Sequence, residues 1–212
     1  MIGWRAQLAG VVILPIGRDL GKATRRRGDT GDRYRLKFGV ETWTLSEHEY
    51  AVWNAVGRCD GPSTPKAVLR AYKENGLPKA RQTLAELGRR GPLVGVPPET
   101  PDAMAIARAV RLLPRLPYAD LSSLPGRSVP MAVGDHSTRE LDMLTWEVLK
   151  YAHPELSLAG AVERSADEAM RAFGPGRNES QPGFVLGHVL RQAAKLVGDR
   201  TACFVASVGG AR

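Results

Sequence analysis

The fold of this chain is decided by residues 45–96, which read LSEHEYAVWNAVGRCDGPSTPKAVLRAYKENGLPKARQTLAELGRRGPLVGV. Near the start of this stretch, Ser46 and Glu49 form a capping box. In such a box the serine hydroxyl accepts from the third helical N–H, and the glutamate side chain accepts from the backbone N–H of the serine. Apolar residues follow as far as Gly57. The pattern predicts a helix that begins after Ser46 and ends at Gly57.

Two further helices and a strand are predicted in the same stretch. Thr64 followed by Pro65 combines a cap with a proline at the first helical position. Pro78 opens the third helix, whose apolar residues recur at i, i+4 and i+7: Ala80, Leu84 and Leu87. Gly91 ends that helix, and the short apolar run Leu93–Val96 predicts a strand.

Strands are also predicted upstream of this stretch. Val11–Ile16 is an apolar run that indicates a buried strand. Between Tyr34 and Val40, apolar and polar residues alternate, which predicts a strand with one wet face. The order is therefore two strands, three short helices and a strand.

This order resembles the winged helix-turn-helix superfamily. The closing residues Leu87-Gly88-Arg89-Arg90-Gly91-Pro92-Leu93-Val94 are similar to the end of the recognition helix in bacterial DNA-binding regulators of this kind. The resemblance covers residues 45–96. It implies an α+β fold in which the third helix enters the major groove of DNA and the wing follows it.

The second half of the chain repeats features of the first half. Val110–Leu113 corresponds to Val11–Leu14, and each run is followed by a proline. Ser137–Glu140 is a second capping box, which is predicted to open a helix as Ser46 does. A closing strand is predicted at residues 201–208.

The repeat predicts an α+β protein built from two tandem winged-helix units, mainly helical with short strands. Residues 1–98 would form a basic first unit, and residues 99–212 a second unit that is close to neutral. Pro97–Pro101 would be the hinge between them.

The distribution of charge distinguishes the two halves. The protein has 212 residues, 30 Lys and Arg against 22 Asp and Glu, and a net charge of +8. Residues 1–100 hold 17 basic and 10 acidic side chains, and so carry seven of the eight surplus charges. This asymmetry favours binding of a polyanion by the first half. A solvated basic surface is the alternative interpretation.

The resemblance implies a DNA-binding site on the third helix. There Arg81 could bridge guanine O6 and N7, and Gln82 could pair with adenine. The candidate site comprises the exposed residues of that helix, the first residues of the wing and an arginine-rich loop: Lys79, Arg81, Gln82, Arg89, Arg90, Arg25, Arg26 and Arg27. Double-stranded DNA is the expected partner, and transcription regulation is the expected function.

A second family has a similar pattern over residues 34–96. Peptide-recognition modules of the PqqD type also combine strands with three helices, and they bind a leader peptide as an added strand beside the third helix. Three segments carry this resemblance: Tyr34-Arg35-Leu36, Ala51-Val52-Trp53, and Asp60-Gly61 before Thr64. Recognition of a leader peptide is therefore the alternative function.

Other classes of protein are disfavoured by the sequence. Its four histidines are isolated and lack metal-ligand spacing, so we expect no metal site. We also expect no enzymatic activity and no cofactor. Two cysteines exclude a disulfide framework, and no apolar run approaches the roughly 20 residues of a membrane span. We expect a cytoplasmic bacterial protein that has no membrane contact. A homodimer is a hypothesis from the added affinity that short DNA sites require, and no effector is assigned.

Overall fold

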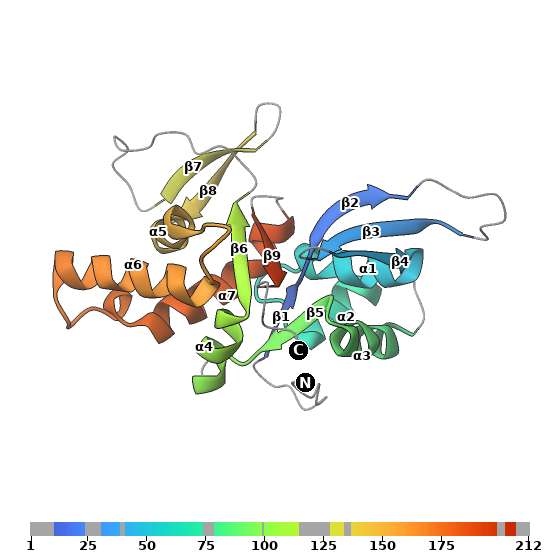
Figure 1. Cartoon of the computed structure of the whole chain (residues 1–212), viewed down its shortest axis with the longest axis horizontal. Helices are drawn as coiled ribbons and strands as arrows, with labels where there is room; N and C mark the ends of the chain where they lie inside the picture. Colours follow the sequence, from blue (N-terminus) through green and yellow to red (C-terminus); the bar gives the residue numbers. More distant parts are fainter. Residues whose placement is uncertain are drawn as a thin grey trace.

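The computed structural model describes residues 11–23, 31–38, 41–73, 79–98, 100–114, 128–133, 137–198 and 202–206. Within these residues the chain has a mixed α+β fold, in which small antiparallel sheets accompany two groups of helices (Figure 1). The α+β class that the sequence predicts is therefore confirmed.

The first half places its helices between strands. The strands before the helices are β1 (Val12–Pro15), β2 (Arg18–Lys22), β3 (Arg33–Phe38) and β4 (Glu41–Ser46). The helices are α1 (Glu47–Ala55), the 3-10 turn η1 (Val56–Arg58), α2 (Pro65–Lys73) and α3 (Ala80–Arg90), and β5 (Leu93–Val96) follows them. β2, β3 and β4 form one antiparallel sheet, while β1 pairs with β5.

The second half begins with an additional helix, α4 (Pro101–Arg108). Its strands before the remaining helices are β6 (Val110–Pro114), β7 (Ser128–Val133) and β8 (Ser137–Asp142). The rest of the half comprises α5 (Met143–Tyr151), α6 (Leu158–Phe173), the 3-10 turn η2 (Asn178–Ser180), α7 (Pro182–Gly198) and β9 (Ala202–Ala206). β6 pairs with β9, and β7 pairs with β8.

The two halves share an order of elements. In each half a first strand pairs antiparallel with the last strand: Val12 lies opposite Val96 in one pair, and Val110 lies opposite Ala206 in the other. A β-hairpin, β3–β4 or β7–β8, and then three helices lie between the paired strands. The repeat seen in the sequence therefore extends to strand pairing, with the hairpin ahead of the helices in both halves.

The helix after each hairpin begins at a different cap. For α1 the predicted capping box is present: Glu49 N donates to Ser46 Oγ at 3.3 Å, and Ser46 N donates to the Glu49 carboxylate at 2.8 Å. The second predicted box, Ser137–Glu140, is wrong, because these residues belong to β8 and their backbone groups pair with β7. α5 begins after Asp142 instead, whose carboxylate accepts from Thr145 N at 2.9 Å.

Strand β1 is buried on both faces because the two halves pack against its opposite sides. Val12, Leu14 and Ile16 belong to the apolar core of the second half, whereas Ile13 belongs to the core of the first. All four side chains are at most 2% exposed. Successive residues of a strand point to opposite faces, so this short run serves two cores. The predicted buried strand is confirmed.

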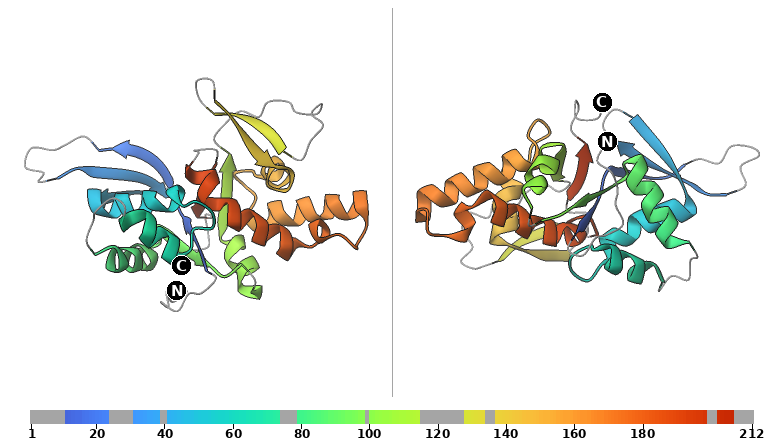
Figure 2. Two further views of the ribbon diagram at one scale, coloured as in Figure 1. Left: turned by 180° about the vertical axis from the view of Figure 1, so that it is seen from behind. Right: turned by 90° about the horizontal axis from the view of Figure 1, so that it is seen from below.

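Contact between the halves extends to α7. This helix packs against α5 and α6, and its C-terminal end meets η1 of the first half (Figure 2). Gly57 and Gly198 cross at that point, where a Cβ added to Gly57 would lie 2.9 Å from Gly198 Cα. Nearby, Gly17 N donates to the Phe204 carbonyl of β9 at 2.7 Å. The first strands of the chain are thus held by elements of both halves.

Candidate nucleic-acid interface

Helix α3 presents a cationic face to solvent. Its Leu84 and Leu87 lie in the core of the first half, where α3 packs against α1 and β5. This packing leaves five residues of the predicted site exposed: Lys79, Arg81, Gln82, Arg89 and Arg90. No side chain caps the N-terminus of α3, and an uncapped helix N-terminus favours anions.

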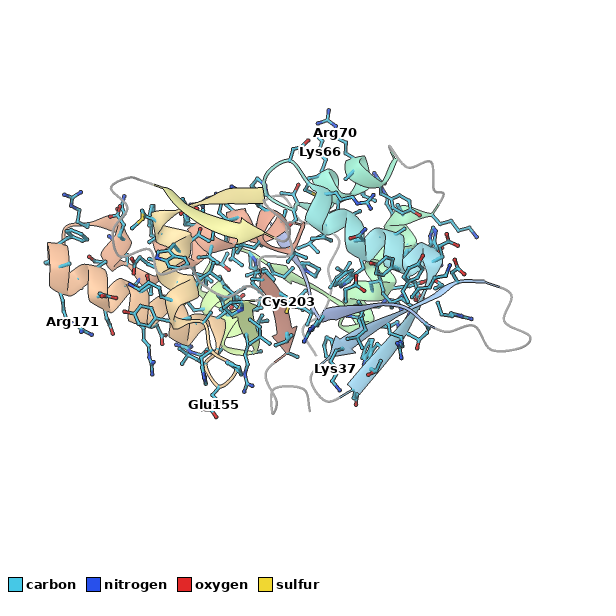
Figure 3. All side chains as sticks on the ribbon, turned by 90° about the horizontal axis from the view of Figure 1, so that it is seen from above. Lys37, Lys66, Arg70, Glu155, Arg171 and Cys203 are labelled. Carbon is cyan, nitrogen blue, oxygen red and sulfur yellow. The ribbon has the colours of Figure 1, made fainter. Side chains whose placement is uncertain are left out.

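Helix α2 adds positive charge beside α3. Together with Lys79, which precedes α3, the two helices contain seven basic residues and a single acidic one, Glu86. The basic residues are Lys66, Arg70, Lys73, Lys79, Arg81, Arg89 and Arg90. Lys66 and Arg70 lie one turn apart and project away from the body in Figure 3. Charge of one sign gathered in this way raises the local potential and attracts polyanions.

Arg90 differs from the other cations because it contacts the protein's own groups. Its guanidinium forms an ion pair with Glu49 of α1 and lies 5.8 Å from the centre of the Trp43 ring on β4. Burial raises the pKa of Glu49, but hydrogen bonds from Ser46 and the charge and hydrogen bond of Arg90 leave it below its ordinary value. Arg90 therefore ties the end of α3 to α1 and β4.

The rest of the predicted site divides into placed and unplaced residues. Gln82 donates to the Glu86 carboxylate at 2.9 Å, in an exposed bond within α3. Arg25, Arg26 and Arg27 lie outside the described residues, so their position relative to α3 stays a prediction. The structure brings Lys79, Arg81, Gln82 and Arg89 together on one helix.

A second group of exposed cations lies on β2 and β3, and the site predicted from the sequence did not include it. Arg33, Arg35 and Lys37 are exposed on β3, and Arg18 is exposed on β2. The signal was present in the sequence, because Arg33, Arg35 and Lys37 alternate with Tyr34, Leu36 and Phe38. A strand that alternates in this way collects one kind of residue on one face.

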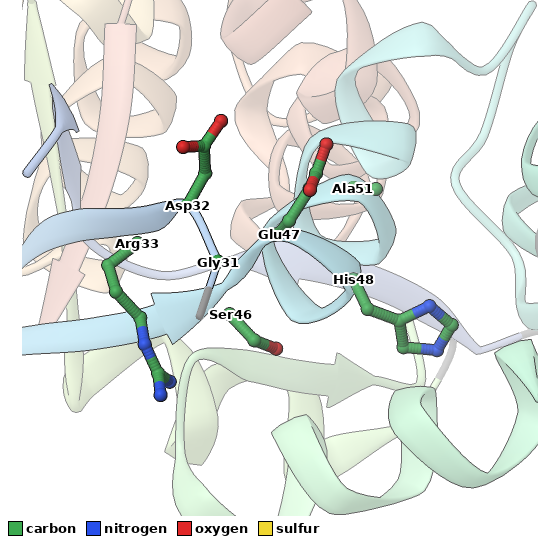
Figure 4. Close-up of a pocket in the computed structure, with 7 residues that line it drawn as sticks. All are labelled: Gly31, Asp32, Arg33, Ser46, Glu47, His48 and Ala51. Atoms are coloured by element: carbon green, nitrogen blue, oxygen red, sulfur yellow. The ribbon is translucent and has the colours of Figure 1, made fainter. Parts of the chain in front are cut away.

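A pocket of about 420 Å³ lies where β4 passes into α1 (Figure 4). Seven residues line it: Gly31, Asp32, Arg33, Ser46, Glu47, His48 and Ala51. Its two carboxylates lie beside a guanidinium and an imidazole, so its charges are mixed. Ser46 Oγ donates to Glu49 at 2.9 Å, and His48 Nδ1 lies 2.9 Å from the Tyr72 hydroxyl. Ser46 and His48 are therefore not arranged as a nucleophile and its base.

The cysteines and acidic groups add no reactive centre to this pocket. Burial and the nearby Asp60 carboxylate raise the pKa of the Cys59 thiol to about 11, so it stays protonated at neutral pH. Cys203 is buried in β9. Among the described residues, no group of three or more His, Cys, Asp or Glu side chains could hold a metal ion.

A contact between a carboxylate and an imidazole joins two elements of the second half. His188 Nε2 on α7 lies 2.6 Å from the Asp142 carboxylate that caps α5. Burial would raise the pKa of Asp142, but hydrogen bonds from His188 and Thr145 outweigh this effect and lower it to about 2. The contact joins α5 and α7, the first and third helices after the hairpin of this half, as Arg90 and Glu49 join α3 and α1 in the other.

Comparison of the chain with protein-family models, with curated proteins and with solved structures finds no match in any of the three. In the described ranges, none of the helices combines the length and the apolar character that crossing a membrane requires. The cationic surfaces are therefore the observations from which a function can be argued.

Proposed function

We propose that the first half binds double-stranded DNA through α3 and that the protein regulates transcription. The observation that carries this proposal is the set of exposed basic residues on and beside α2 and α3: Lys66, Arg70, Lys79, Arg81 and Arg89. Such a set suits the phosphate backbone, which supplies most of the affinity of DNA-binding proteins.

Each exposed residue of α3 has a role in this proposal. Arg81 contacts a guanine edge, and Gln82 exchanges its bond with Glu86 for an adenine edge in the major groove. Lys79 and Arg89 hold phosphates at the two ends of the helix. Arg90, which the sequence suggested as a phosphate contact, acts in this scheme by fixing α3 against α1.

The proposal treats both halves as winged-helix-like units. Support comes from the three α-helices that follow the hairpin in each half and from the repeated order of elements. The second unit, whose charge is close to neutral, would mediate dimerisation or bind an effector. Sedimentation analysis at several protein concentrations tests the dimer.

Fluorescence polarisation with a labelled random-sequence duplex tests DNA binding. Each phosphate contact contributes about −0.9 to the slope of log affinity against log salt. Phosphate contacts from Lys66, Arg70, Lys79 and Arg89 would therefore give a slope of about −3.6. Absence of binding at low salt would reject the proposal.

Two substitutions sharpen this measurement. Arg81→Ala should weaken binding and relax base preference in a selection from random sequences. Arg171→Ala removes the same charge from an exposed position on α6, and it should leave duplex affinity unchanged. Equal affinities of the two variants would show that α3 does not contact DNA.

A second candidate function is recognition of an extended peptide, and one observation favours it. The β2–β3–β4 sheet comes directly before three helices, and β4 is an outer strand of that sheet. The end of α3 lies beside the same sheet, since a side chain at Gly91 would be 3.6 Å from the Phe38 ring and 3.8 Å from Trp43. A peptide could pair with the outer edge of β4 and contact α3.

Hydrogen exchange separates these two functions. A peptide that adds a strand protects backbone amides of residues 41–46, whereas DNA on α3 leaves their exchange rates unchanged. The acidic peptides to use are those encoded next to the gene, with a scrambled peptide as the control. Protection by the genuine peptide alone would support peptide recognition over DNA binding.

A further inference from the structure

The solvent-facing side of the β2–β3–β4 sheet is a second cationic surface. Leu36 and Leu45 are buried, so the residues that alternate with them face outward. The outward residues that are exposed, here called the basic sheet face, are Arg18, Leu20, Arg33, Arg35, Lys37, Thr42 and Thr44. Four of the seven are cationic and none is acidic.

The carboxylates of these strands lie away from this face. Asp19 accepts from the Tyr50 hydroxyl of α1 at 2.7 Å, on the side where Tyr34 and Tyr50 stack with their centroids 4.0 Å apart. Glu41 accepts from Trp43 Nε1 at 3.0 Å. The sheet therefore separates its charges, with the acidic groups bonded to aromatic side chains and the cations in solvent.

Two cations of this face are available to a ligand. Within the described part of the chain, neither Arg18 nor Arg35 has an ion-pair partner. Arg18 lies on β2 and Arg35 on β3, and both side chains are exposed. A polyanion that covered the face would supply the negative charge that these two cations lack.

We propose that the basic sheet face docks on the phosphate backbone of duplex nucleic acid. The inference rests on the proposed function, to which it adds a second and sequence-independent contact. The cations would neutralise phosphates, and the hydroxyls of Thr42 and Thr44 would donate to phosphate oxygens.

The composition of the face favours a nucleic-acid duplex over a single strand or a lipid surface. The seven outward residues include no aromatic side chain on which the bases of a single strand could stack. Leu20 is the one apolar residue among them, and this is a weak anchor for a lipid surface. The cations and threonine hydroxyls of the face instead suit a partner that supplies negative charge and hydrogen-bond acceptors. The phosphates of a duplex supply both.

The face and the α2–α3 surface are separate. α1 lies between them, because it packs against β3 and β4 on one side and against α2 and α3 on the other. Figure 3 shows Lys37 of the sheet and Lys66 and Arg70 of α2 at opposite sides of the first half. The two surfaces would therefore hold different segments of nucleic acid.

The test compares variants of the full chain that lose two charges each. Arg35→Gln with Lys37→Gln removes two cations of the face, and Arg164→Gln with Arg171→Gln removes two exposed cations of α6 as the control. The probe is a labelled random-sequence duplex at 50 and 200 mM salt. Two lost phosphate contacts should make the drop in affinity across that range about 12-fold smaller than for the wild type. The control pair should behave as wild type, and circular dichroism confirms that both variants fold.

The outcomes distinguish this inference from the proposed function. If the sheet variant retains the wild-type salt dependence while Arg81→Ala weakens binding, the inference is overturned. The proposed contact between α3 and DNA is then supported. If the sheet variant alone loses binding, the inference stands and the α3 contact fails. Binding of phosphatidylserine vesicles without binding of duplex would overturn it in favour of a membrane. If the control pair lost as much salt dependence as the sheet variant, the effect would come from net charge alone. That result would also overturn the inference.

Discussion

The crossing of η1 and α7 offers a substitution whose cost follows from the structure. A Cβ at Gly57 would lie 2.9 Å from Gly198 Cα and 3.0 Å from Gly198 N. Both of these atoms belong to the backbone, so no side-chain rotation makes room for Gly57→Ala. The substitution must separate η1 from α7, and with them the two halves of the molecule.

Two opposing effects set the magnitude. Gly57 does not have a positive φ, so alanine would restrict the unfolded chain and by itself add about 0.4–1 kcal/mol to the free energy of unfolding. Forcing packed elements apart costs about 1–3 kcal/mol. We expect the free energy of unfolding to fall by about 1–2 kcal/mol.

Urea denaturation followed by circular dichroism measures this change through the transition midpoint. Gly183→Ala is the matched control in the first turn of α7, where an added Cβ meets no atom within 4 Å. The control should be neutral or slightly stabilising. A midpoint for Gly57→Ala at or above that of the wild type would refute the close crossing and the locking of the halves.

Three further changes test individual contacts. The folded pKa of Asp142 is about 2, below its ordinary value of 3.8, so its contribution to stability is present above pH 4 and is lost as the pH falls toward 2. Since its side chain is 35% exposed, Asp142→Asn should cost about 1 kcal/mol at pH 7 and little at pH 2, as urea titrations at both pH values would show. Arg90→Ala should lower the free energy of unfolding by about 0.5–1 kcal/mol and leave the salt slope of duplex binding unchanged, whereas Arg89→Ala should reduce that slope and leave stability unchanged. Leu87→Ala removes a fully buried side chain and should cost about 2–5 kcal/mol in the same titration, and a smaller loss would place α3 outside the core.

Local signals in the sequence were sufficient to predict the start of α1 and the buried side of α3 in the first half. The capping box at Ser46 and Glu49 acts within one helical turn, so the pattern alone located the start of α1. The spacing of Leu84 and Leu87 likewise identified the buried side of α3, and hence its exposed side. Such features depend on neighbours along the chain and not on distant partners.

Non-local contacts explain what the sequence left out. Ser137–Glu140 has the residues of a capping box, but pairing with β7 satisfies its backbone groups, and Asp142 caps the helix instead. Arg90 has the sequence context of a phosphate contact, yet Glu49 lies 41 positions earlier and binds it. The first partner is the neighbouring strand of a hairpin and the second lies far along the chain, and neither pairing is visible in the local pattern.

The near-neutral second half helps to position the charge of the first half. Ile16 of the chain entering β2 packs in the core of the second half and pairs with Phe204 of β9, which also accepts from Gly17 N. Arg18 follows immediately and begins the basic sheet face. The place of this face is therefore set by β9 as well as by its own sheet. A change that displaced β9 would therefore be expected to move Arg18 relative to α3.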